Sequence, residues 1–350
     1  MQRWTIATVI IILLVTFIIK LLRQNAQHGK KTTTQSTASE YQKFYPYIMA
    51  DFERCERESP DIIIWVQGRA TSNQLRSMIR DTYGNQKNWP HNMTVTLIFF
   101  IGELPKNKIQ YQNMLQYEFG LYKDIVQNNY SESYRNQVSK MVSAINYITD
   151  YCNQSKLILR IDDDVIFHPR LMFDTLSDVF LNSSESSQQH LHQSSNLTIF
   201  QLPRNTIACH LISDFEVWRK KDHPKHFNAV DDTVLPGEAL YPPFCAGFFV
   251  AMSGDVPGKL RSHIATNKPF WMDDRYMGVL QKRASINNIN ISPILDFGYK
   301  SITSDVLDLL ANHKKIVRHL PGKQKFHISQ LYGYLDLSIR GLKGHFETIK

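Results

Sequence analysis

Runs of apolar residues alternate with amphipathic stretches from residue 62 onward. Residues 62–66, Ile-Ile-Ile-Trp-Val, and residues 94–101 are rich in β-branched and aromatic side chains, which predicts two buried strands. Residues 73–82 and 110–119 lie after these runs and predict helices, and residues 124–127 predict a short strand. Strands and helices that alternate in this way predict an α/β fold.

The clearest helix signal covers residues 134–148. Its apolar side chains recur every three or four positions, which is typical of a helix with one buried face: Tyr134, Val138, Met141, Val142, Ile145 and Ile148. Residues 157–161 are again apolar and predict the next strand. We therefore expect a doubly wound, mixed but largely parallel sheet with helices on both faces. Ligands of such sheets lie beyond the carboxyl ends of the strands.

Three adjacent carboxylates, Asp162, Asp163 and Asp164, follow that strand directly. Like charges so close repel one another and are costly to desolvate, so a cation or hydrogen-bond donors must compensate them. Oxygen ligands favour a hard ion such as Mn2+ or Mg2+, which usually keeps open positions for phosphate oxygens. The alternative is an acidic surface turn, because Asp is also a common turn residue.

The segments after the triplet carry weaker signals. Residues 182–196 are rich in Ser, Gln and His and predict a solvated loop, and residues 198–202 predict another strand. Residues 210–234 are charged and aromatic without a clear period. We see no internal repeat and no second domain boundary after residue 60.

The amino-terminal residues predict a membrane anchor. Residues 6–22 are almost wholly apolar, and the polar residues that follow them show no apolar period. We expect a cytoplasmic tail at 1–5, a transmembrane signal anchor at 6–22, a flexible lumenal stem at 23–60 and one folded lumenal domain at 61–350. A cleaved signal peptide is the alternative, but residues 21–31 offer no convincing small-x-small cleavage site.

Basic residues after the span favour the opposite orientation under the positive-inside rule, so the lumenal placement rests on other features. Six Asn-x-Ser/Thr sequons are spread along the chain, at Asn92, Asn129, Asn153, Asn182, Asn196 and Asn290. All four cysteines, Cys55, Cys152, Cys209 and Cys245, follow the span. In an oxidising compartment they can form two disulfides in any of three connectivities.

Composition and charge add two limits. The chain has 350 residues, of which 43% are hydrophobic, and this is enough for a substantial core. The net charge of +8 comes from scattered Lys and Arg with no block of like charges, which argues against a nucleic-acid partner. We attribute the basic excess to solubility and to binding of a phosphorylated donor.

Six separated segments, residues 76–84, 99–102, 118–140, 162–165, 241–247 and 273–278, resemble one known family in the family's order. Asp-Asp-Asp-Val at 162–165 is similar to its metal motif, and Asp-Asp-Arg-Tyr-Met-Gly at 273–278 is similar to its Glu-Asp-Val-Tyr-x-Gly. Together the segments resemble the β-1,3-galactosyltransferase family, which also includes β-1,3-N-acetylglucosaminyltransferases. Residues after 278 carry no motif that aligns with it.

The resemblance implies a single-pass type II enzyme of the Golgi membrane with a GT-A fold and a catalytic domain in the lumen. Such an enzyme transfers a hexose, galactose or an N-acetylhexosamine, from a UDP-sugar to a glycan hydroxyl in β-1,3 linkage and inverts the anomeric carbon. Its cofactor is Mn2+ or Mg2+, and its acceptor is a glycan on a glycoprotein or glycolipid. The diphosphate becomes a good leaving group once its charge is neutralised.

The resemblance also assigns site residues. Asp164 is the expected metal ligand, with Asp162 supporting the metal or holding the ribose, and Asp163 and Gly247 are expected at the donor. Arg76 and Arg80, one turn apart on one helix face, are expected to contact the uracil or the diphosphate. The alternative for the two arginines is an ordinary surface pair.

Inversion in one displacement needs a general base for the acceptor hydroxyl. The family pattern places it in Asp273-Asp274, and we choose Asp274 because a neighbouring carboxylate raises its pKa, which suits a base. The alternative is that these residues cap a helix, which Asp commonly does.

The chain departs from the family pattern at several positions. Phe248 stands where a second Gly is usual, and Arg275 replaces an apolar residue beside the expected base. Cys is missing before the Asp triplet and after residue 278, which leaves Cys245 to pair with Cys209. Three histidines near the carboxyl terminus, His313, His319 and His327, are candidates for a second metal ligand, although a lone His is more often structural.

Two other functions compete with the transferase. Because of Phe248 and Arg275, the chain could be a catalytically silent lumenal protein that binds a UDP-sugar or a glycan. A metal-dependent phosphohydrolase shares the acidic triplet, but residues 162–167 lack the nucleophilic Asp-x-Asp-x-Thr or a phosphate-binding glycine loop.

Overall fold

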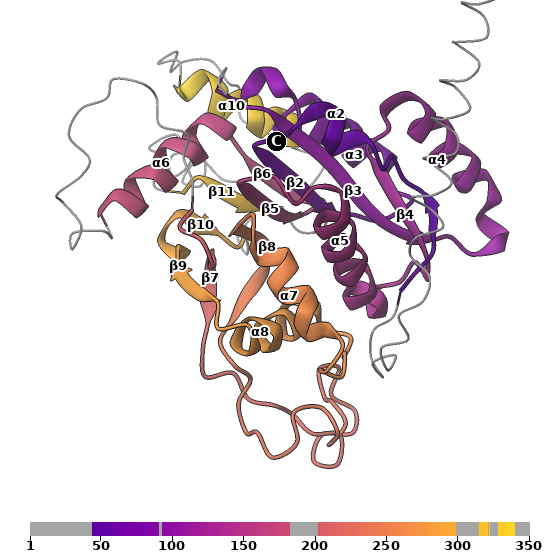
Figure 1. The fold of residues 1–350 in the computed structure, drawn as a ribbon, viewed down its shortest axis with the longest axis vertical. Helices are drawn as coiled ribbons and strands as arrows, with labels where there is room; N and C mark the ends of the chain where they lie inside the picture. The colour runs from indigo at the N-terminus through magenta and orange to yellow at the C-terminus, as the bar shows by residue number, and fades with distance from the viewer. Residues whose placement is uncertain are drawn as a thin grey trace, which may run out of the picture. The chain divides into compact units, whose positions relative to one another are not determined.

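An eight-stranded mixed sheet carries the fold (Figure 1). The computed structural model describes residues 44–90, 93–182, 202–298, 315–320, 322 and 328–339. In spatial order the strands are β1 (Tyr47–Met49), β4 (Ile125–Ser131), β3 (Val95–Glu103), β2 (Ile62–Gln67), β5 (Leu157–Asp162), β8 (Phe244–Ser253), β7 (Thr206–Ile212) and β9 (Asn287–Asn290). The pairs β2/β3, β2/β5, β3/β4 and β7/β9 are parallel, whereas β1/β4, β5/β8 and β7/β8 are antiparallel.

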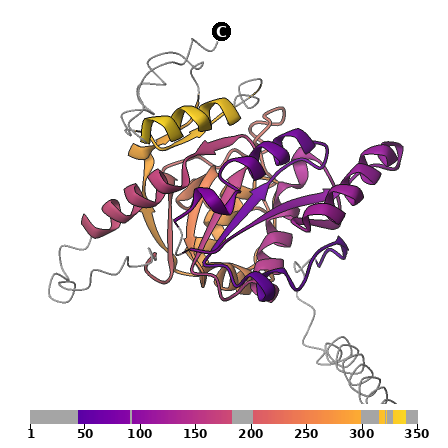
Figure 2. The same ribbon diagram turned by 90° about the horizontal axis from the view of Figure 1, so that it is seen from above.

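Helices cover both faces of this sheet (Figures 1 and 2). One apolar cluster joins the sheet to α3 (Asn73–Asp81), α4 (Ile109–Tyr122), α6 (Pro169–Asn182) and α10 (Ile328–Ile339). The other joins it to α2 (Arg54–Glu58), α5 (Gln137–Tyr151), α7 (Val256–Ile264) and α8 (Asp273–Arg283). The alternation along β2 explains the division, because Ile62, Ile64 and Val66 face the first cluster and Ile63 and Trp65 face the second.

A small second sheet brings the end of the chain to the acidic triplet. It contains β10 (Leu295–Asp296), β11 (Val317–His319) and β6 (Val165–Phe167), in that order. In the antiparallel pairing of β11 with β6, His319 lies opposite Val165. Short 3-10 helices η1 (Gln86–Asn88), η2 (Lys106–Lys108), η3 (Tyr134–Asn136) and η4 (Ser292–Ile294) complete the fold.

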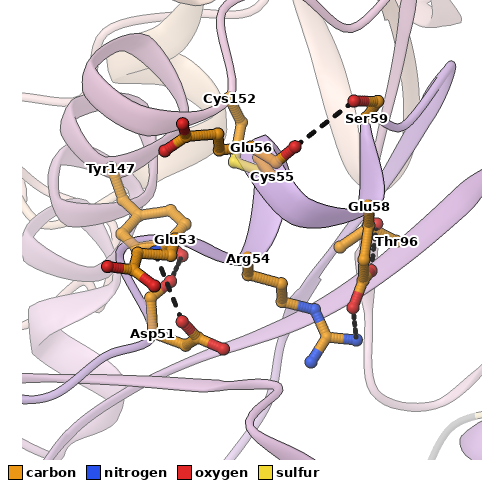
Figure 3. Close-up of a disulfide and its surroundings, with 10 residues drawn as sticks. All are labelled: Asp51, Glu53, Arg54, Cys55, Glu56, Glu58, Ser59, Thr96, Tyr147 and Cys152. Atoms are coloured by element: carbon orange, nitrogen blue, oxygen red, sulfur yellow. Dashed lines mark hydrogen bonds and ion pairs between the residues drawn. A yellow bond between two sulfur atoms is a disulfide. The ribbon is translucent and has the colours of Figure 1, made fainter. Parts of the chain in front are cut away.

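Residues 44–60 form part of this fold, although we placed them in the stem from the sequence. β1 pairs with β4, and Cys55 in α2 forms a disulfide with Cys152 just after α5 (Figure 3). The hydroxyl of Tyr147 in α5 donates to the carbonyl of Asp51, which fixes the same segment a second time. The ordered elements therefore begin before the predicted boundary at residue 61.

The other disulfide joins Cys209 in β7 to Cys245 in β8, so all four cysteines are paired. We expected Cys245 to pair with Cys209, because this chain lacks two cysteines that are usual in the family, and the structure confirms the pairing. The predicted tail and apolar span lie outside the described residues. Among the residues that the structure does describe, no helix has the length and apolarity to cross a membrane.

The early elements match the sequence predictions within a few residues, but the later ones do not. Most of the predicted loop at 182–196 and of the predicted strand at 198–202 lies outside the described residues, and the strand that follows, β7, was not predicted. Residues 213–243 form a long connection without helices or regular strands. Arg219 holds this connection through hydrogen bonds to the carbonyls of Val234, Leu235 and Glu238, which leaves no periodic signal.

Candidate active site

The candidate site lies at the carboxyl ends of β2 and β5. These strands are parallel neighbours, and their register sets Gln67 beside Asp162. Beyond Asp162 the chain turns into β6, so Asp163 and Asp164 project from a two-residue connection between two strands. The acidic triplet therefore occupies the edge of the sheet at which ligands of α/β folds bind.

Asp163 is buried and faces the loop after β2. Its carboxylate accepts the backbone N–H of Arg69, with Oδ2 at 3.2 Å from the nitrogen. A Cβ atom on Gly68 would lie 3.2 Å from the same oxygen, so a side chain there would crowd the carboxylate. The buried Lys140 donates to the Gly68 carbonyl at 2.5 Å and pairs with Glu132 at 2.8 Å. These contacts hold the loop after β2 in place.

Asp164 faces His319. The register of β11 on β6 brings the two residues together, and the N–H of Leu320 donates to the Asp164 carbonyl at 2.7 Å. The Nε2 atom of His319 lies 3.2 Å from Asp164 Oδ1, and its Nδ1 atom lies 3.3 Å from the carbonyl oxygen of Phe297. Phe248 packs against the imidazole, with 5.6 Å between the ring centroids.

The charges at this end of the site shift two pKa values. Burial, together with the charges of Asp164 and Asp273, raises the pKa of Asp162 to about 7 against the opposing effect of Arg160. Burial lowers the pKa of His319, but the hydrogen bond to Asp164 and the charges of Asp164 and Asp162 together outweigh burial, so the pKa is raised. The raised pKa of Asp162 shows that its charged form is disfavoured despite the nearby Arg160, and a cation bound at the triplet would favour that form.

A divalent cation fits this donor set. In the part of the chain that the structure describes, no three His, Cys, Asp or Glu side chains form a group able to hold a metal by themselves. Asp164 and His319 offer one oxygen and one nitrogen, which suits an ion whose other ligands are phosphate oxygens of a substrate. A metal held by Asp164 and His319 would replace the Nε2 proton that now faces Asp164, while Nδ1 donates to the Phe297 carbonyl.

One buried guanidinium joins the triplet to the second carboxylate pair. Arg160 of β5 donates through Nη2 to Asp273 Oδ2 at 2.5 Å, and the same nitrogen lies 3.9 Å from Asp162 Oδ1. Gln67 donates to Asp273 Oδ2 from β2 at 2.9 Å. Asp273 is thus ion-paired to Arg160 and accepts two hydrogen bonds at one oxygen, which fixes the position of its carboxylate.

Gly247 leaves room for that guanidinium. Its carbonyl accepts a hydrogen bond from Arg160 Nη1. A Cβ atom at this position would lie 2.7 Å from Nη1, so any side chain would displace Arg160. The structure thus gives Gly247, which we expected at the donor, a steric role next to the acidic cluster.

Asp274 has a different environment from Asp273. It lies in the first turn of α8, and its Oδ1 atom accepts the N–H of Arg275 at 2.7 Å. Burial and, after it, the charge of Asp273 raise the pKa of Asp274. The N-cap residue of α8 is Met272, which makes no side-chain capping hydrogen bond. Asp273 and Asp274 lie inside the first turn, so neither of them is the N-cap that we considered as the alternative.

Arg76 and Arg80 do not join these carboxylates. Arg76 is 1% exposed, pairs with Glu118 through two hydrogen bonds, and donates to the carbonyl of Arg69. Arg80 pairs with Asp124 at 2.7 Å and also with Glu118. Their hydrogen-bonding groups are used inside the fold, so the geometry favours a structural role in place of the expected donor contact.

Phe248 and Arg275, the two departures from the family pattern that suggested a catalytically silent protein, both pack against aromatic rings. Phe248 supports His319, as described above, and Arg275 turns away from the carboxylates. The guanidinium of Arg275 lies 4.6 Å from the ring centre of Phe215 and also faces Tyr241 and Phe244.

Sequence reasoning did not find Gln67 and Arg160. Arg160 did have a signal, because a charged residue inside the apolar run at 157–161 needs a buried partner. Gln67 had none, since its role depends on the strand register. His319 was one of three candidate histidines, and the other two, His313 and His327, lie outside the described residues.

Comparisons with known proteins show to which family the chain belongs. A family model described as galactosyltransferase matches residues 74–292, which is more than half of the chain and includes both carboxylate groups. The crystal structure of the galactosyltransferase LgtC with donor and acceptor sugar analogues covers 82% of this chain and 98% of its own at 8% identity, with a TM-score of 0.34. A TM-score this low supports no conclusion.

Several curated relatives are similar over about 70% of the chain. UDP-GalNAc:beta-1,3-N-acetylgalactosaminyltransferase 1 of Rattus norvegicus is 23% identical over 68% of this chain and 65% of the relative. UDP-GlcNAc:betaGal beta-1,3-N-acetylglucosaminyltransferase 7 of Rattus norvegicus is 26% identical, over 70% and 56%. Beta-1,3-galactosyltransferase 2 of Mus musculus is 24% identical, over 70% and 52%. The matches span less than two thirds of these relatives, and with the family model they confirm the resemblance: the chain belongs to the galactosyltransferase family.

Proposed function

We propose that this protein is an inverting hexosyltransferase that moves a hexose, galactose or an N-acetylhexosamine, from a UDP-sugar to a glycan hydroxyl in β-1,3 linkage. One observation carries the proposal. The buried Arg160 pairs with Asp273 and lies 3.9 Å from Asp162, so the acidic triplet and the Asp273-Asp274 pair lie on either side of one guanidinium. A reaction that needs a neutralised leaving group and a nearby proton acceptor requires both groups in one site.

Asp164 and His319 would hold Mn2+ or Mg2+ at the donor side, with Asp162 beside them. When bound, the cation neutralises charge that develops on the diphosphate as UDP leaves. The contact of Nδ1 with the Phe297 carbonyl and the packing of Phe248 orient the imidazole. Asp163 orients the loop after β2 through the Arg69 N–H.

Asp274 is the better base of the acidic pair. Oδ2 of Asp273 already accepts hydrogen bonds from Gln67 and Arg160, so this oxygen is occupied where a base would have to receive a proton. Oδ1 of Asp274 accepts the Arg275 N–H, so we assign the proton to Oδ2. The acceptor oxygen bonds to the anomeric carbon as its proton passes to Oδ2 and the bond to the UDP oxygen breaks, and the electron pair of that bond leaves with UDP.

Fold type and location belong to the same proposal. A mixed sheet with its acidic motif at a strand end supports a GT-A fold. Two disulfides support an oxidising compartment. We propose a single-pass type II protein of the Golgi membrane, anchored by residues 6–22 with the tail at 1–5 and with a stem before the folded domain.

Release of UDP tests the function. The chain is incubated with Mn2+, a glycan panel and UDP-galactose, UDP-N-acetylglucosamine or UDP-N-acetylgalactosamine. Asp274→Asn should lower kcat by about 10²- to 10⁴-fold and keep calorimetric binding of UDP with Mn2+. Asp164→Asn should weaken that binding itself.

Two results would contradict the mechanism. Full turnover by Asp274→Asn would exclude Asp274 as the base. Binding of UDP with Mn2+ by the wild-type chain, without transfer to any acceptor, would instead support the silent sugar-nucleotide binder.

A further inference from the structure

Three aromatic side chains from separate segments meet near the carboxylates. Tyr134 begins η3, Phe227 lies in the long 213–243 connection, and Trp271 precedes α8. The ring centroids are 6.0 Å apart for Tyr134 and Phe227, 5.9 Å for Tyr134 and Trp271, and 4.7 Å for Phe227 and Trp271. We call these three rings the aromatic platform.

The platform is held together, yet much of it faces solvent. The guanidinium of Arg135 lies 4.1 Å from the ring centre of Phe227 and 4.3 Å from that of Trp271, which fixes both rings. Tyr134 is 63% exposed and Phe227 is 50% exposed. Large apolar rings that are ordered but left open commonly mark a binding surface.

Two observations place the platform beside the expected base. Trp271 comes two residues before Asp273 and three before Asp274, at the start of the same helix. The pKa of Tyr134 is raised, by burial first and then by the charges of Asp273 and Asp274. A molecule on the platform would therefore reach the carboxylates from the side of α8.

We infer that the aromatic platform of Tyr134, Phe227 and Trp271 is the acceptor subsite and binds a pyranose ring of the glycan. This assignment rests on the proposed transferase function. A pyranose has one face of C–H groups, which packs on aromatic rings, and a rim of hydroxyls, which stays free for polar partners. A sugar held in this way next to Asp274 can offer one hydroxyl to the base while UDP occupies the side of Asp164 and His319.

Binding of defined sugars tests the subsite. The probes are methyl β-galactopyranoside, methyl N-acetyl-β-glucosaminide and N-acetyllactosamine, measured by saturation-transfer NMR on the full chain with UDP. Mg2+ replaces Mn2+ because Mn2+ is paramagnetic. The variants are Phe227→Ala and Tyr134→Ala, which remove exposed rings, and the matched control is Tyr117→Ala, whose ring on α4 is 72% exposed.

The wild type should transfer saturation to the C–H protons of one ring face. Each platform variant should weaken sugar binding, and raise the acceptor KM where turnover is seen, by about tenfold. The affinity for UDP with Mg2+ should stay unchanged, and Tyr117→Ala should match the wild type. Equal thermal unfolding of the variants would show that they are folded.

The outcomes separate the subsite from the transferase function. Unchanged sugar binding in both platform variants, or no saturation transfer by the wild type to any probe, would overturn the subsite. Platform-dependent sugar binding without any turnover would keep the subsite and reject the enzyme. An equal loss in the Tyr117→Ala control would show a nonspecific effect of losing an exposed ring and would also overturn the subsite.

Discussion

A single buried cation sets the charge balance of the site. Arg160 lies inside β5 and donates to Asp273 and to the Gly247 carbonyl while it approaches Asp162. A buried guanidinium without partners is strongly destabilising, so these acceptors are required for folding as well as for chemistry. The same contact occupies Oδ2 of Asp273. Burial and the charge of Asp273 raise the pKa of Asp274.

Gly247→Ala should disrupt this arrangement from a position without any functional group. The new methyl group would lie 2.7 Å from Arg160 Nη1 and would displace the guanidinium from Asp273. We expect a loss of about 100-fold in kcat, since small misplacements of catalytic groups have effects of this size. UDP release and thermal unfolding measure the change.

Gly258→Ala is the matched control. Gly258 lies in α7, and a Cβ atom there meets Thr149 at 3.8 Å, an ordinary contact. Because Ala favours a helix over Gly, this variant should be more stable by about 0.5–1 kcal/mol and fully active. Equal activity of the two glycine variants would argue against the steric role of Gly247.

The raised pKa of Asp274 predicts opposite changes in activity and stability. The base must be ionised, so kcat should fall as the pH drops through the raised pKa, at higher pH than for an ordinary Asp. Burial makes the charged form of Asp274 unfavourable in the folded protein, which lowers the free energy of unfolding. This destabilisation is complete at pH values above the pKa of the folded state and absent below the pKa of the unfolded state. Asp274→Asn should therefore raise the melting temperature at pH 7, and the gain should vanish in acid.

A pH series of calorimetric melts tests this sign. Asp81→Asn is a suitable control, because Asp81 is exposed at the end of α3 and has no role in the site. A melting temperature of Asp274→Asn below that of the wild type at neutral pH would contradict the burial of a charged carboxylate.

Individual site residues were predictable where the chemistry is local in sequence. Adjacent carboxylates such as Asp162–Asp164 must be compensated wherever they lie. Arg76 and Arg80 show the limit of such reasoning, because helical spacing shows that two side chains share a face but does not show what faces them. Their partners, Glu118 and Asp124, come from the next helix and from the residue before β4.

The short strand β11 supplies an essential element of the site. Its pairing with β6 sets His319 against Asp164, and no local pattern in the sequence announces a three-residue strand. His319→Ala should weaken binding of Mn2+ in the presence of UDP by at least about tenfold, measured by calorimetry. His223→Ala, an exposed histidine of the long connection, should bind as the wild type does. Equal affinities in the two variants would remove His319 from the metal site.

The two disulfides should differ in what they protect. Cys55–Cys152 ties α2 to the end of α5, whereas Cys209–Cys245 joins β7 to β8, two residues before Gly247. Replacing both cysteines of either pair by Ser should cost about 2–5 kcal/mol of stability. Loss of Cys209–Cys245 should also lower kcat at temperatures where the protein is folded, and loss of Cys55–Cys152 should not. Equal kcat in the two double variants would contradict this distinction.

Elements were predictable where burial is complete. β2, β3 and β5 are buried on both faces, so each leaves a continuous apolar run in the sequence. The connection at 213–243 left no such signal, because isolated backbone bridges and the hydrogen bonds of Arg219 to backbone carbonyls hold it without a regular strand. Contacts of this kind have no sequence period to detect.

The surface of the whole domain bears on its compartment. Asn129, Asn153 and Asn290, three of the six sequons, are exposed in the structure. Expression in the secretory pathway of a chain whose other three sequon asparagines are changed to Gln should yield carbohydrate at these positions, released by peptide N-glycosidase. Each further Asn→Gln change should remove one mobility step on a gel. If none of the three asparagines carried carbohydrate, the result would contradict the lumenal placement.

The position of His319 has a consequence for protein synthesis. The aspartates of the triplet leave the ribosome well before the imidazole that faces one of them, because β11 is the last strand of the described chain. A nascent or prematurely terminated polypeptide that ends before this strand has an acidic loop without its nitrogen partner. In the proposed enzyme, competence to capture a nucleotide therefore begins only after β11 has left the ribosome.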